Sequence, residues 1–217
     1  MEREAFLKRV STALGRTDTS APNDGNGVSG VPDFYRSASI GGDRIDRFVT
    51  ELDAVGGRVV RASTVAEASA LLRGLVPETA SVLTWDRSEF EGWGVDWLWD
   101  DAAAKAGVVD LSAEIGVTTV DYAVANTGTI VLTTSASRAR SASLVVSTHI
   151  ALVKAEQIVD RLGEAFAGVS GRGPMPSGMY CITGPSRSAD IENDLTIGVH
   201  GPAALVVVLL TPQTGVR

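Results

Sequence analysis

The apolar positions of the chain change their spacing along its length, and each spacing predicts a different kind of element. In residues 43–56, apolar side chains recur at every third or fourth position, which is the period of one face of an α-helix. These side chains are Ile45, Phe48, Val49 and Leu52. Asp43 is a favourable N-cap and Gly56 a favourable terminator, so a helix is predicted between them.

The next segment alternates between strand and helix patterns. Residues 57–62 (GRVVRA) and 80–85 (ASVLTW) predict strands, because they are short and rich in β-branched side chains. Residues 64–76 (TVAEASALLRGLV) predict a helix that Pro77 ends. The order strand, helix, strand is typical of a parallel sheet with crossover helices.

The rest of the chain continues this alternation but contains more strand-like runs. A loop and a helix are predicted over residues 90–107, followed by a short strand over 108–111. A further helix is predicted over 155–168, where Ile158, Val159, Leu162 and Phe166 form one apolar stripe. Other strands are predicted over residues 120–135, 142–154, 179–183 and 203–210. The whole pattern predicts an α/β protein.

Residues 1–42 differ from this body and predict a separate N-terminal segment. Residues 1–14 have the spacing of an amphipathic helix and lack the apolar run of a signal peptide. Residues 15–42 are mostly Gly, Ser, Thr, Asp, Asn and Pro, which predicts a flexible arm. Phe34 and Tyr35 suit that arm to dock on a neighbouring surface, either the body of the chain or another subunit. The predicted α/β domain is therefore residues 43–217.

Composition narrows the function classes. The chain has 19 basic and 26 acidic residues and a net charge of −7, which argues against nucleic acid or an anionic membrane as the main partner. No apolar run reaches the roughly 18 residues of a membrane span. The single cysteine, Cys181, cannot form an internal disulfide or hold an iron–sulfur cluster, and this favours a cytoplasmic protein. Cys181 is expected to be a small buried side chain in a strand.

Two polar clusters interrupt the predicted strands. In NTGTI (126–130), Gly128 between two threonines would let backbone N–H groups approach an anion, although a turn or bulge glycine has the same pattern. Arg138 precedes a strand that carries His149, and an arginine there suits a carboxylate or phosphate. A solvated surface arginine and a hydrogen-bonded core histidine are the alternatives.

A third cluster lies in CITGPSRSADIE (181–192). A strand, a Gly-Pro turn and then a helix capped by Ser186 or Ser188 are predicted, and such a helix N-terminus attracts anions. Asp190 and Glu192 are two positions apart and do not share a helical face, so at most one of them is expected to face a ligand. His200 lies on a turn before the last strand, where function is favoured over packing.

The sequence contains no phosphate-loop or dinucleotide-binding motif, so nucleotide binding of the usual kinds has no support. It contains no zinc-protease motif either, and no metal ligands are predicted. Four other motifs occur in a recognisable order: ANTGTIVL, THIALV, GPSRSADIE and GVHGP. Over residues 115–211 they resemble the LUD domain, specifically the lactate-utilisation protein C family. Residues 43–114 resemble that family only in their α/β alternation.

The resemblance implies a three-layer α/β/α sandwich with a mostly parallel sheet, similar to ribose-5-phosphate isomerases, sugar-phosphate deaminases and CoA transferases. It implies a ligand, a small carboxylate or phosphate, at the carboxyl ends of the strands, with Glu192, Asp190 and His200 as the candidates for catalysis. Family members often have a glutamate at the position of Asn126, so the role of general base would move to Asp190 or Glu192. The implied ligand-binding residues are Thr127, Gly128, Thr129, His149, Gly184, Ser186, Arg187 and Gly201, to which the arginine pattern adds Arg138.

The resemblance also implies a partner system, and the single cysteine agrees with a non-redox role for this chain within it. Proteins of this family act in the cytoplasm with iron–sulfur partner proteins that oxidise L-lactate to pyruvate, so the clusters are expected on those partners and no cofactor on this chain. Two alternatives stay open. One is a stand-alone enzyme on a CoA-transferase or sugar-phosphate-isomerase-like scaffold, and the other is a regulatory module that binds a small carboxylate.

Overall fold

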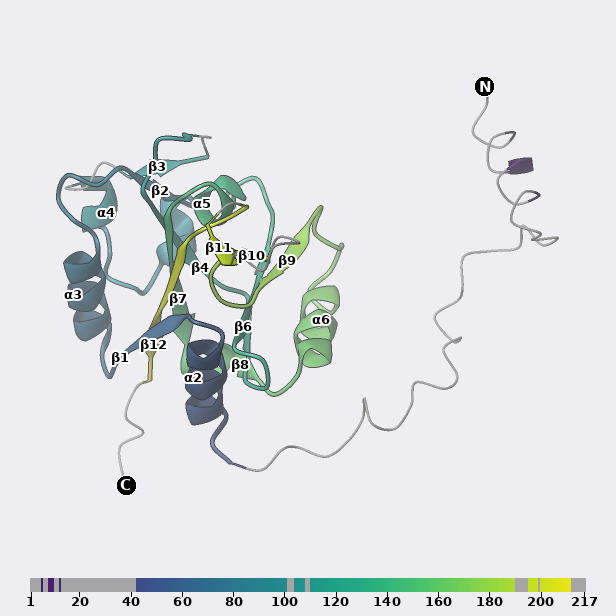
Figure 1. Ribbon diagram of the computed structural model, residues 1–217, viewed down its shortest axis with the longest axis horizontal. Coiled ribbons are helices and arrows are strands. Elements are labelled where there is room, and N and C mark those ends of the chain that lie inside the picture. Colours follow the sequence, from purple (N-terminus) through teal and green to yellow (C-terminus); the bar gives the residue numbers. More distant parts are fainter. Residues whose placement is uncertain are drawn as a thin grey trace. The chain divides into compact units, whose positions relative to one another are not determined.

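The computed structural model describes residues 42–100, 104–107, 110–189, 195–198 and 200–211, and in addition the isolated residues Ala5, Lys8, Arg9 and Thr12. The chain divides into two units, Met1–Ser39 and Ile40–Arg217. The predicted N-terminal helix and arm lie almost entirely outside the described residues. All elements below belong to the second unit, which is shown in Figure 1.

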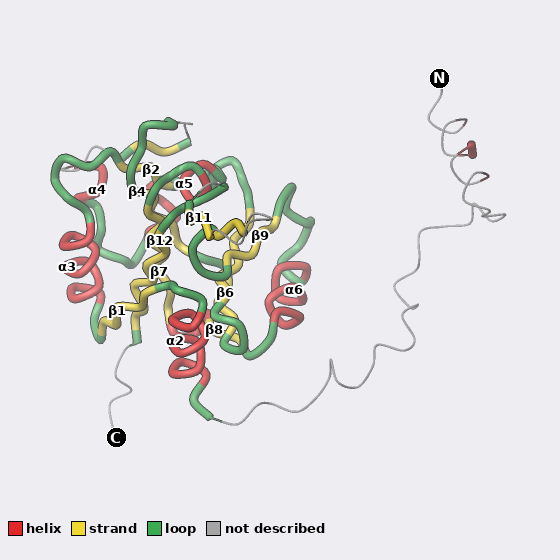
Figure 2. The backbone as a smooth tube through the Cα atoms, in the orientation of Figure 1, coloured by secondary structure: helices red, strands yellow, loops and turns green. Residues whose placement is uncertain are grey.

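The larger sheet has six parallel strands, as the α/β alternation predicts (Figures 1 and 2). In spatial order they are β1 (Arg58–Ala62), β12 (Ala204–Leu210), β7 (Thr148–Lys154), β4 (Ile115–Thr119), β2 (Val82–Thr84) and β3 (Lys105–Ala106). The register of β12 and β7 runs from Ala204 opposite Thr148 to Leu210 opposite Lys154. These central strands are almost wholly buried, which explains their continuous apolar sequences.

A second sheet, of four strands, lies beside the first. The sequence pattern did not indicate that the strands form two sheets. Its order is β8 (Ile158–Val159), β5 (Tyr122–Val124), β6 (Thr129–Thr133) and β9 (Met179–Ile182). The β5–β6 pair is an antiparallel hairpin. The chain passes from the first sheet to the second between Thr119 and Tyr122, and Asp121 therefore lies at the junction of the two sheets.

Local capping explains where the two longest helices begin. In α2 (Arg44–Ala54) the Asp43 carboxylate accepts a hydrogen bond from the Ile45 N–H, which confirms the predicted N-cap. The helix ends at Ala54, and Gly56, two residues later, has a φ of 86° in the left-handed region that terminates it. In α3 (Val65–Leu75) the Thr64 hydroxyl accepts from the Glu67 N–H. Shorter helices are α4 (Trp97–Asp100), α5 (Ser141–Leu144) and α6 (Leu162–Ser170), with 3₁₀ turns at Arg87–Phe90 and Ala155–Gln157.

Two of the predicted helices are shorter than the sequence pattern indicates. The helix expected from residue 155 begins at Leu162, because Ile158 and Val159 pair with β5 as strand β8. The helix expected to end near Gly107 covers only α4, and Lys105–Ala106 instead pairs with β2. The strand predicted over 108–111 is not formed at 110–111, and residues 108 and 109 lie outside the described residues. In both places strand pairing overrides a helical apolar pattern.

The helix predicted after Ser186 is wrong. Residues Arg187–Ala189 form β10, which pairs antiparallel with β11 (Leu195–Ile197). Ser and Asp favour turns as strongly as helix N-caps, so the local signal was ambiguous and the pairing decided it. The anion site that such a helix N-terminus would provide therefore has no basis here.

One apolar core joins α2, α3 and both sheets, with Phe48, Leu72, Trp85, Ile130 and Leu152 among its fully buried side chains. Cys181 lies in a strand, β9, as predicted, but β9 is an edge strand and the side chain is exposed instead of buried. Within the described residues, no helix has the length and apolar character needed to cross a membrane.

Candidate functional site

A charged cavity of about 330 Å³ lies where the central parallel strands end. It is lined by Thr119 and Val120 at the end of β4 and by Lys154 at the end of β7. The carboxyl ends of parallel strands are the usual place for ligands in open α/β sheets. Its other charged lining residues are Glu89, Glu91, Asp121, Arg138, Glu156 and Arg172.

A second hollow, of about 400 Å³, lies over residues 87–99. Its basic residue, Arg87, is held on the surface by Asp96 and Asp100. That hollow draws its lining from one continuous segment, whereas the cavity at the strand ends gathers side chains from five separate segments. We therefore take the cavity at the strand ends as the candidate site.

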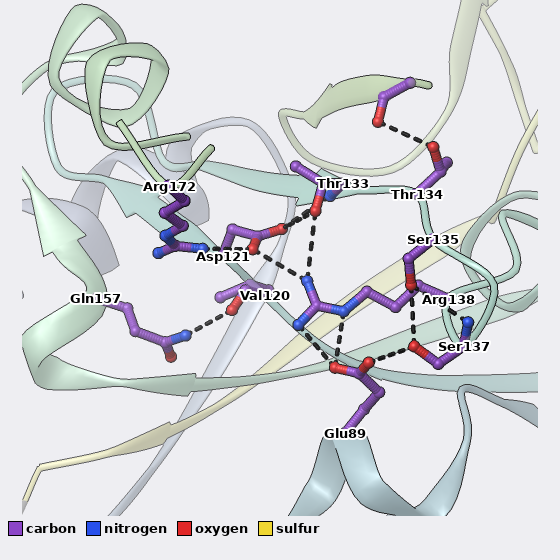
Figure 3. A network of polar contacts seen from close by, with 11 residues as sticks. Glu89, Val120, Asp121, Thr133, Thr134, Ser135, Ser137, Arg138, Gln157 and Arg172 are labelled. Carbon is purple, nitrogen blue, oxygen red and sulfur yellow. Dashed lines mark hydrogen bonds and ion pairs between the residues drawn. The ribbon is translucent and has the colours of Figure 1, made fainter. Parts of the chain in front are cut away.

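Asp121 is the centre of the polar network in this cavity (Figure 3). Its side chain is only 3% exposed, yet both carboxylate oxygens are satisfied. Oδ2 accepts from the N–H and the hydroxyl of Thr133, at 2.8 and 2.9 Å. Oδ1 accepts from Nη1 of Arg138 at 3.0 Å and from Nη1 of Arg172 at 2.8 Å. These four donors provide the hydrogen bonds that a buried carboxylate requires.

Arg138 links Asp121 to Glu89, and Figure 3 shows it lying between the two carboxylates. Nε and Nη2 of Arg138 both lie 2.7 Å from Oε2 of Glu89. Burial on its own raises the pKa of Glu89, but hydrogen bonds from Arg138 and Ser137 outweigh it, so that this pKa is lowered. Burial likewise lowers the pKa of Arg138, and the two carboxylates more than compensate, so that it is raised. Both groups stay charged.

Two other cations line the cavity with most of their donors unused. The Lys154 ammonium lies 5.6 Å from the centre of the Trp93 ring, and the Arg172 guanidinium lies 4.7 Å from that of Tyr122. Within the described part of the chain, Lys154 makes no side-chain ion pair, and Arg172 pairs with Asp121 through one nitrogen. These cations can bind an oxyanion.

Most predicted ligand-binding residues lie elsewhere, around the C-terminal end of α2. Gly128 packs against the backbone of Leu52, Gly184 against Val55, and the Arg187 guanidinium against Gly56. The Ser186 N–H donates to the carbonyl of Pro202 at 2.8 Å, next to Gly201. This region precedes β1 and β12 and is therefore at the amino ends of those strands.

The three threonines of this region form a chain of hydroxyl groups. The Thr129 hydroxyl lies 2.7 Å from those of Thr127 and Thr183. Beside it, Oδ1 of Asn126 accepts from Nη1 of Arg47 at 3.0 Å. The structure thus brings the predicted Thr, Gly and Ser residues together, but not at the carboxyl ends of the strands, where the resemblance implied a ligand. Their binding role stays a prediction.

His149 is a core residue, which corrects the prediction that it lines a cleft. Its ring is fully buried in β7, and Nε2 lies 2.8 Å from the Thr118 hydroxyl. Nδ1 has no hydrogen-bond partner among the described residues. Burial lowers the pKa of His149 to about 3, so the ring is neutral. The cause is the continuous apolar run of β7, which buries both of its faces.

Of the other predicted site residues that the structure describes, Arg138 alone lines the cavity at the strand ends, and its three guanidinium nitrogens already bind carboxylates. Asp190 and Glu192 lie outside the described residues. His200 is exposed on the turn before β12, and its predicted role remains untested.

Sequence reasoning missed Asp121, Lys154, Arg172 and the three lining glutamates. A signal existed for two of them: Asp121 and Lys154 stand at the ends of apolar runs that form parallel strands, where functional residues gather. Glu89 and Arg172 carry no comparable signal, because Glu89 lies in a short 3₁₀ turn and Arg172 in the loop after α6. In the described ranges, no group of three or more His, Cys, Asp or Glu side chains is placed to hold a metal ion.

Comparison with known proteins identifies the family. The model of the LUD domain matches residues 45–210. Lactate utilization protein C of Bacillus licheniformis is 34% identical, with 95% of each chain covered. The protein of the same name from Geobacillus sp. is 31% identical, covering 97% of this chain and 96% of that relative.

The fold has a counterpart in the crystal structure of a DUF162 family protein from Deinococcus radiodurans. That chain is similar with a TM-score of 0.58 and 19% identity, covering 77% of this chain and 96% of its own length. At this identity the likeness shows the fold alone. Together with the match over residues 45–210, the two relatives above 30% identity establish that this chain belongs to the LUD domain family.

Proposed function

We propose that this chain is a non-redox component of a cytoplasmic system that oxidises L-lactate to pyruvate, and that it acts with iron–sulfur partner proteins. The observation that carries the proposal is the 34% identity to a lactate utilization protein C over 95% of both chains. Sequence identity over nearly the whole length is better support for a shared role than similarity of fold alone.

The single cysteine supports the assignment of the iron–sulfur clusters to partner proteins. Iron–sulfur clusters are held by several cysteine thiolates, and the chain has one cysteine. Electrons from lactate would therefore pass to clusters on the partner proteins. In this proposal the present chain contributes a binding surface or an acid–base group, for which Asp190, Glu192 and His200 remain the proposed residues.

Deleting the gene tests the proposal. The deletion strain is expected to lose growth on L-lactate as sole carbon source while it grows normally on pyruvate. A plasmid copy of the gene should restore growth on lactate. Normal growth of the deletion strain on lactate, with unchanged lactate consumption, would overturn the proposal.

The partner part of the proposal has its own test. An affinity-tagged copy of the chain, expressed in the native cells during growth on lactate, is expected to copurify with proteins that carry iron–sulfur absorption near ~400 nm, the region typical of such clusters. A control purification uses cells grown on pyruvate. If the tagged protein restores growth on lactate but never copurifies with cluster-bearing proteins, the partner assignment is wrong.

A further inference from the structure

The cavity at the strand ends contains two cationic side chains, and carboxylates engage few of their hydrogen-bond donors. Lys154 and Arg172 both line it, and they come from different elements, the end of β7 and the loop after α6. Lysine has three donors and arginine five. Within the described residues, one donor nitrogen of this pair is engaged by a carboxylate, namely Nη1 of Arg172. The cavity therefore offers a cationic site that the fold itself does not use.

Neighbouring side chains hold Arg172 in a position from which it can bind an anion. One edge of its guanidinium is fixed by Asp121, and its plane lies over the Tyr122 ring. The Arg172 side chain is nevertheless 53% exposed, so its remaining N–H groups are accessible. An arginine fixed on one edge and one face loses little conformational freedom when its other edge binds an oxyanion.

The acidic lining restricts which anion fits. Four acidic side chains line the cavity against three basic ones. Glu89 and Asp121 are bound to arginines, whereas Glu91 and Glu156 are exposed at the cavity and have no ion-pair partner in the described part of the chain. They repel a second negative charge and accept hydrogen bonds from a hydroxyl group. A volume of about 330 Å³ is at the small end of ligand pockets and suits a small molecule.

We propose that this cavity binds a small hydroxycarboxylate with a single negative charge. Its carboxylate lies between Lys154 and Arg172, and its hydroxyl group donates to Glu91 or Glu156. The choice of a hydroxycarboxylate, rather than another small anion that carries a hydroxyl, rests on the proposed function. The location and the preference for a monoanion rest on the cavity itself.

Calorimetric titration of the full-length protein with sodium L-lactate tests this inference. Binding is expected for the wild-type protein, and about tenfold weaker binding for Lys154→Met and for Arg172→Met, because each loses a charge-assisted hydrogen bond. Lys105→Met and Arg61→Met are the matched controls, since both residues form exposed ion pairs away from the cavity. Both controls should bind L-lactate as the wild type does, and circular dichroism checks that all four variants fold.

Three comparison ligands test the ligand class. Propionate lacks the hydroxyl group, and L-malate and inorganic phosphate bring a second charge; all three are expected to bind more weakly than L-lactate. The inference is overturned if L-lactate at about 50 mM, well above the ~1 mM affinity expected of so small a ligand, gives no heat and no shift in melting temperature. It is also overturned if both cavity variants bind L-lactate like the wild type, or if propionate, L-malate or phosphate binds as tightly.

The two proposals fail separately. If the deletion strain cannot grow on lactate and the protein binds no L-lactate, the ligand assignment fails and the proposed function stands. If the deletion strain grows normally and the protein still binds L-lactate through Lys154 and Arg172, the ligand assignment stands and the proposed function fails.

Discussion

At the scale of single residues, His149 has the clearest consequence for stability. Its buried ring stays neutral because its pKa is lowered to about 3, whereas in the unfolded chain histidine titrates near ~6.5. Below pH ~6.5 the unfolded state therefore binds a proton that the folded state does not bind. The free energy of unfolding consequently falls as the pH falls. The loss should approach about 1.4 kcal/mol per pH unit between pH ~6 and the folded pKa.

We expect His149→Leu to show a shallower loss of stability with acidification than the wild type, because it removes this titration. Urea unfolding at a series of pH values from neutral to mildly acidic measures it. His200→Gln is the control, since His200 is the other histidine of the chain and is exposed. Parallel curves for the wild type and His149→Leu would contradict the burial of a neutral ring.

Asp121 is the second residue whose environment predicts a large effect. Asp121→Asn removes the charge that faces both Arg138 and Arg172, and Arg138 is largely buried. Removing one partner of a buried ion pair leaves the other poorly compensated, so we expect a loss of about 3 kcal/mol in the free energy of unfolding.

The matched control for Asp121 is Asp46→Asn, because Asp46 pairs with Arg61 on the surface and both side chains are exposed. Its expected cost is below about 1 kcal/mol. Urea unfolding of the two variants gives the comparison. Equal losses in both would mean that the Asp121 network contributes no more to stability than a surface ion pair.

At the scale of elements, the packing of α2 on the β5–β6 hairpin depends on a glycine. Gly128 has a φ of 61°, and a Cβ built there would overlap the backbone of Leu52. Gly128→Ala must therefore strain the turn and displace the helix, at a cost of about 2–4 kcal/mol. The geometry thus supports a packing role for Gly128 in this turn. The anion-binding role of the same turn stays a prediction.

Gly74 in α3 is the matched control for Gly128. No atom lies within 4 Å of a Cβ built at Gly74, and it lies in a helix, so Gly74→Ala should stabilise by about 0.5–1 kcal/mol. Thermal and urea unfolding should give opposite signs for the two substitutions. A stabilising Gly128→Ala would show that the hairpin and α2 are not in close contact.

At the scale of the whole molecule, the described core is contained in the second unit. Its buried residues run from Phe48 to Leu210, and the division of the chain falls between Ser39 and Ile40. A variant that begins at Gly42 is therefore expected to keep its cooperative unfolding, with a melting temperature within about 4 °C of the full chain, the shift that corresponds to roughly 1 kcal/mol. Circular dichroism during heating measures it, and a molten or aggregated product would contradict the predicted domain boundary.

The sequence by itself determined the elements that depend on near neighbours. The cap Asp43, the helical pattern that begins at residue 64, and the apolar runs of β1, β7 and β12 are local patterns, and the structure has elements at all of them. The α/β class with a mostly parallel sheet follows from the same patterns, since alternating strands and helices leave few other arrangements.

Only the tertiary structure decided how distant segments pair. Ile158 and Val159 fit a helical stripe, but pairing with β5 makes them a strand, and residues 187–189 pair with 195–197 instead of beginning a helix. The cavity depends most on such contacts: Glu89 and Arg138 are 49 positions apart, and Arg172 and Asp121 are 51. Local spacing reflects interactions within a few residues, whereas charge pairing between loops depends on where the strands end in space.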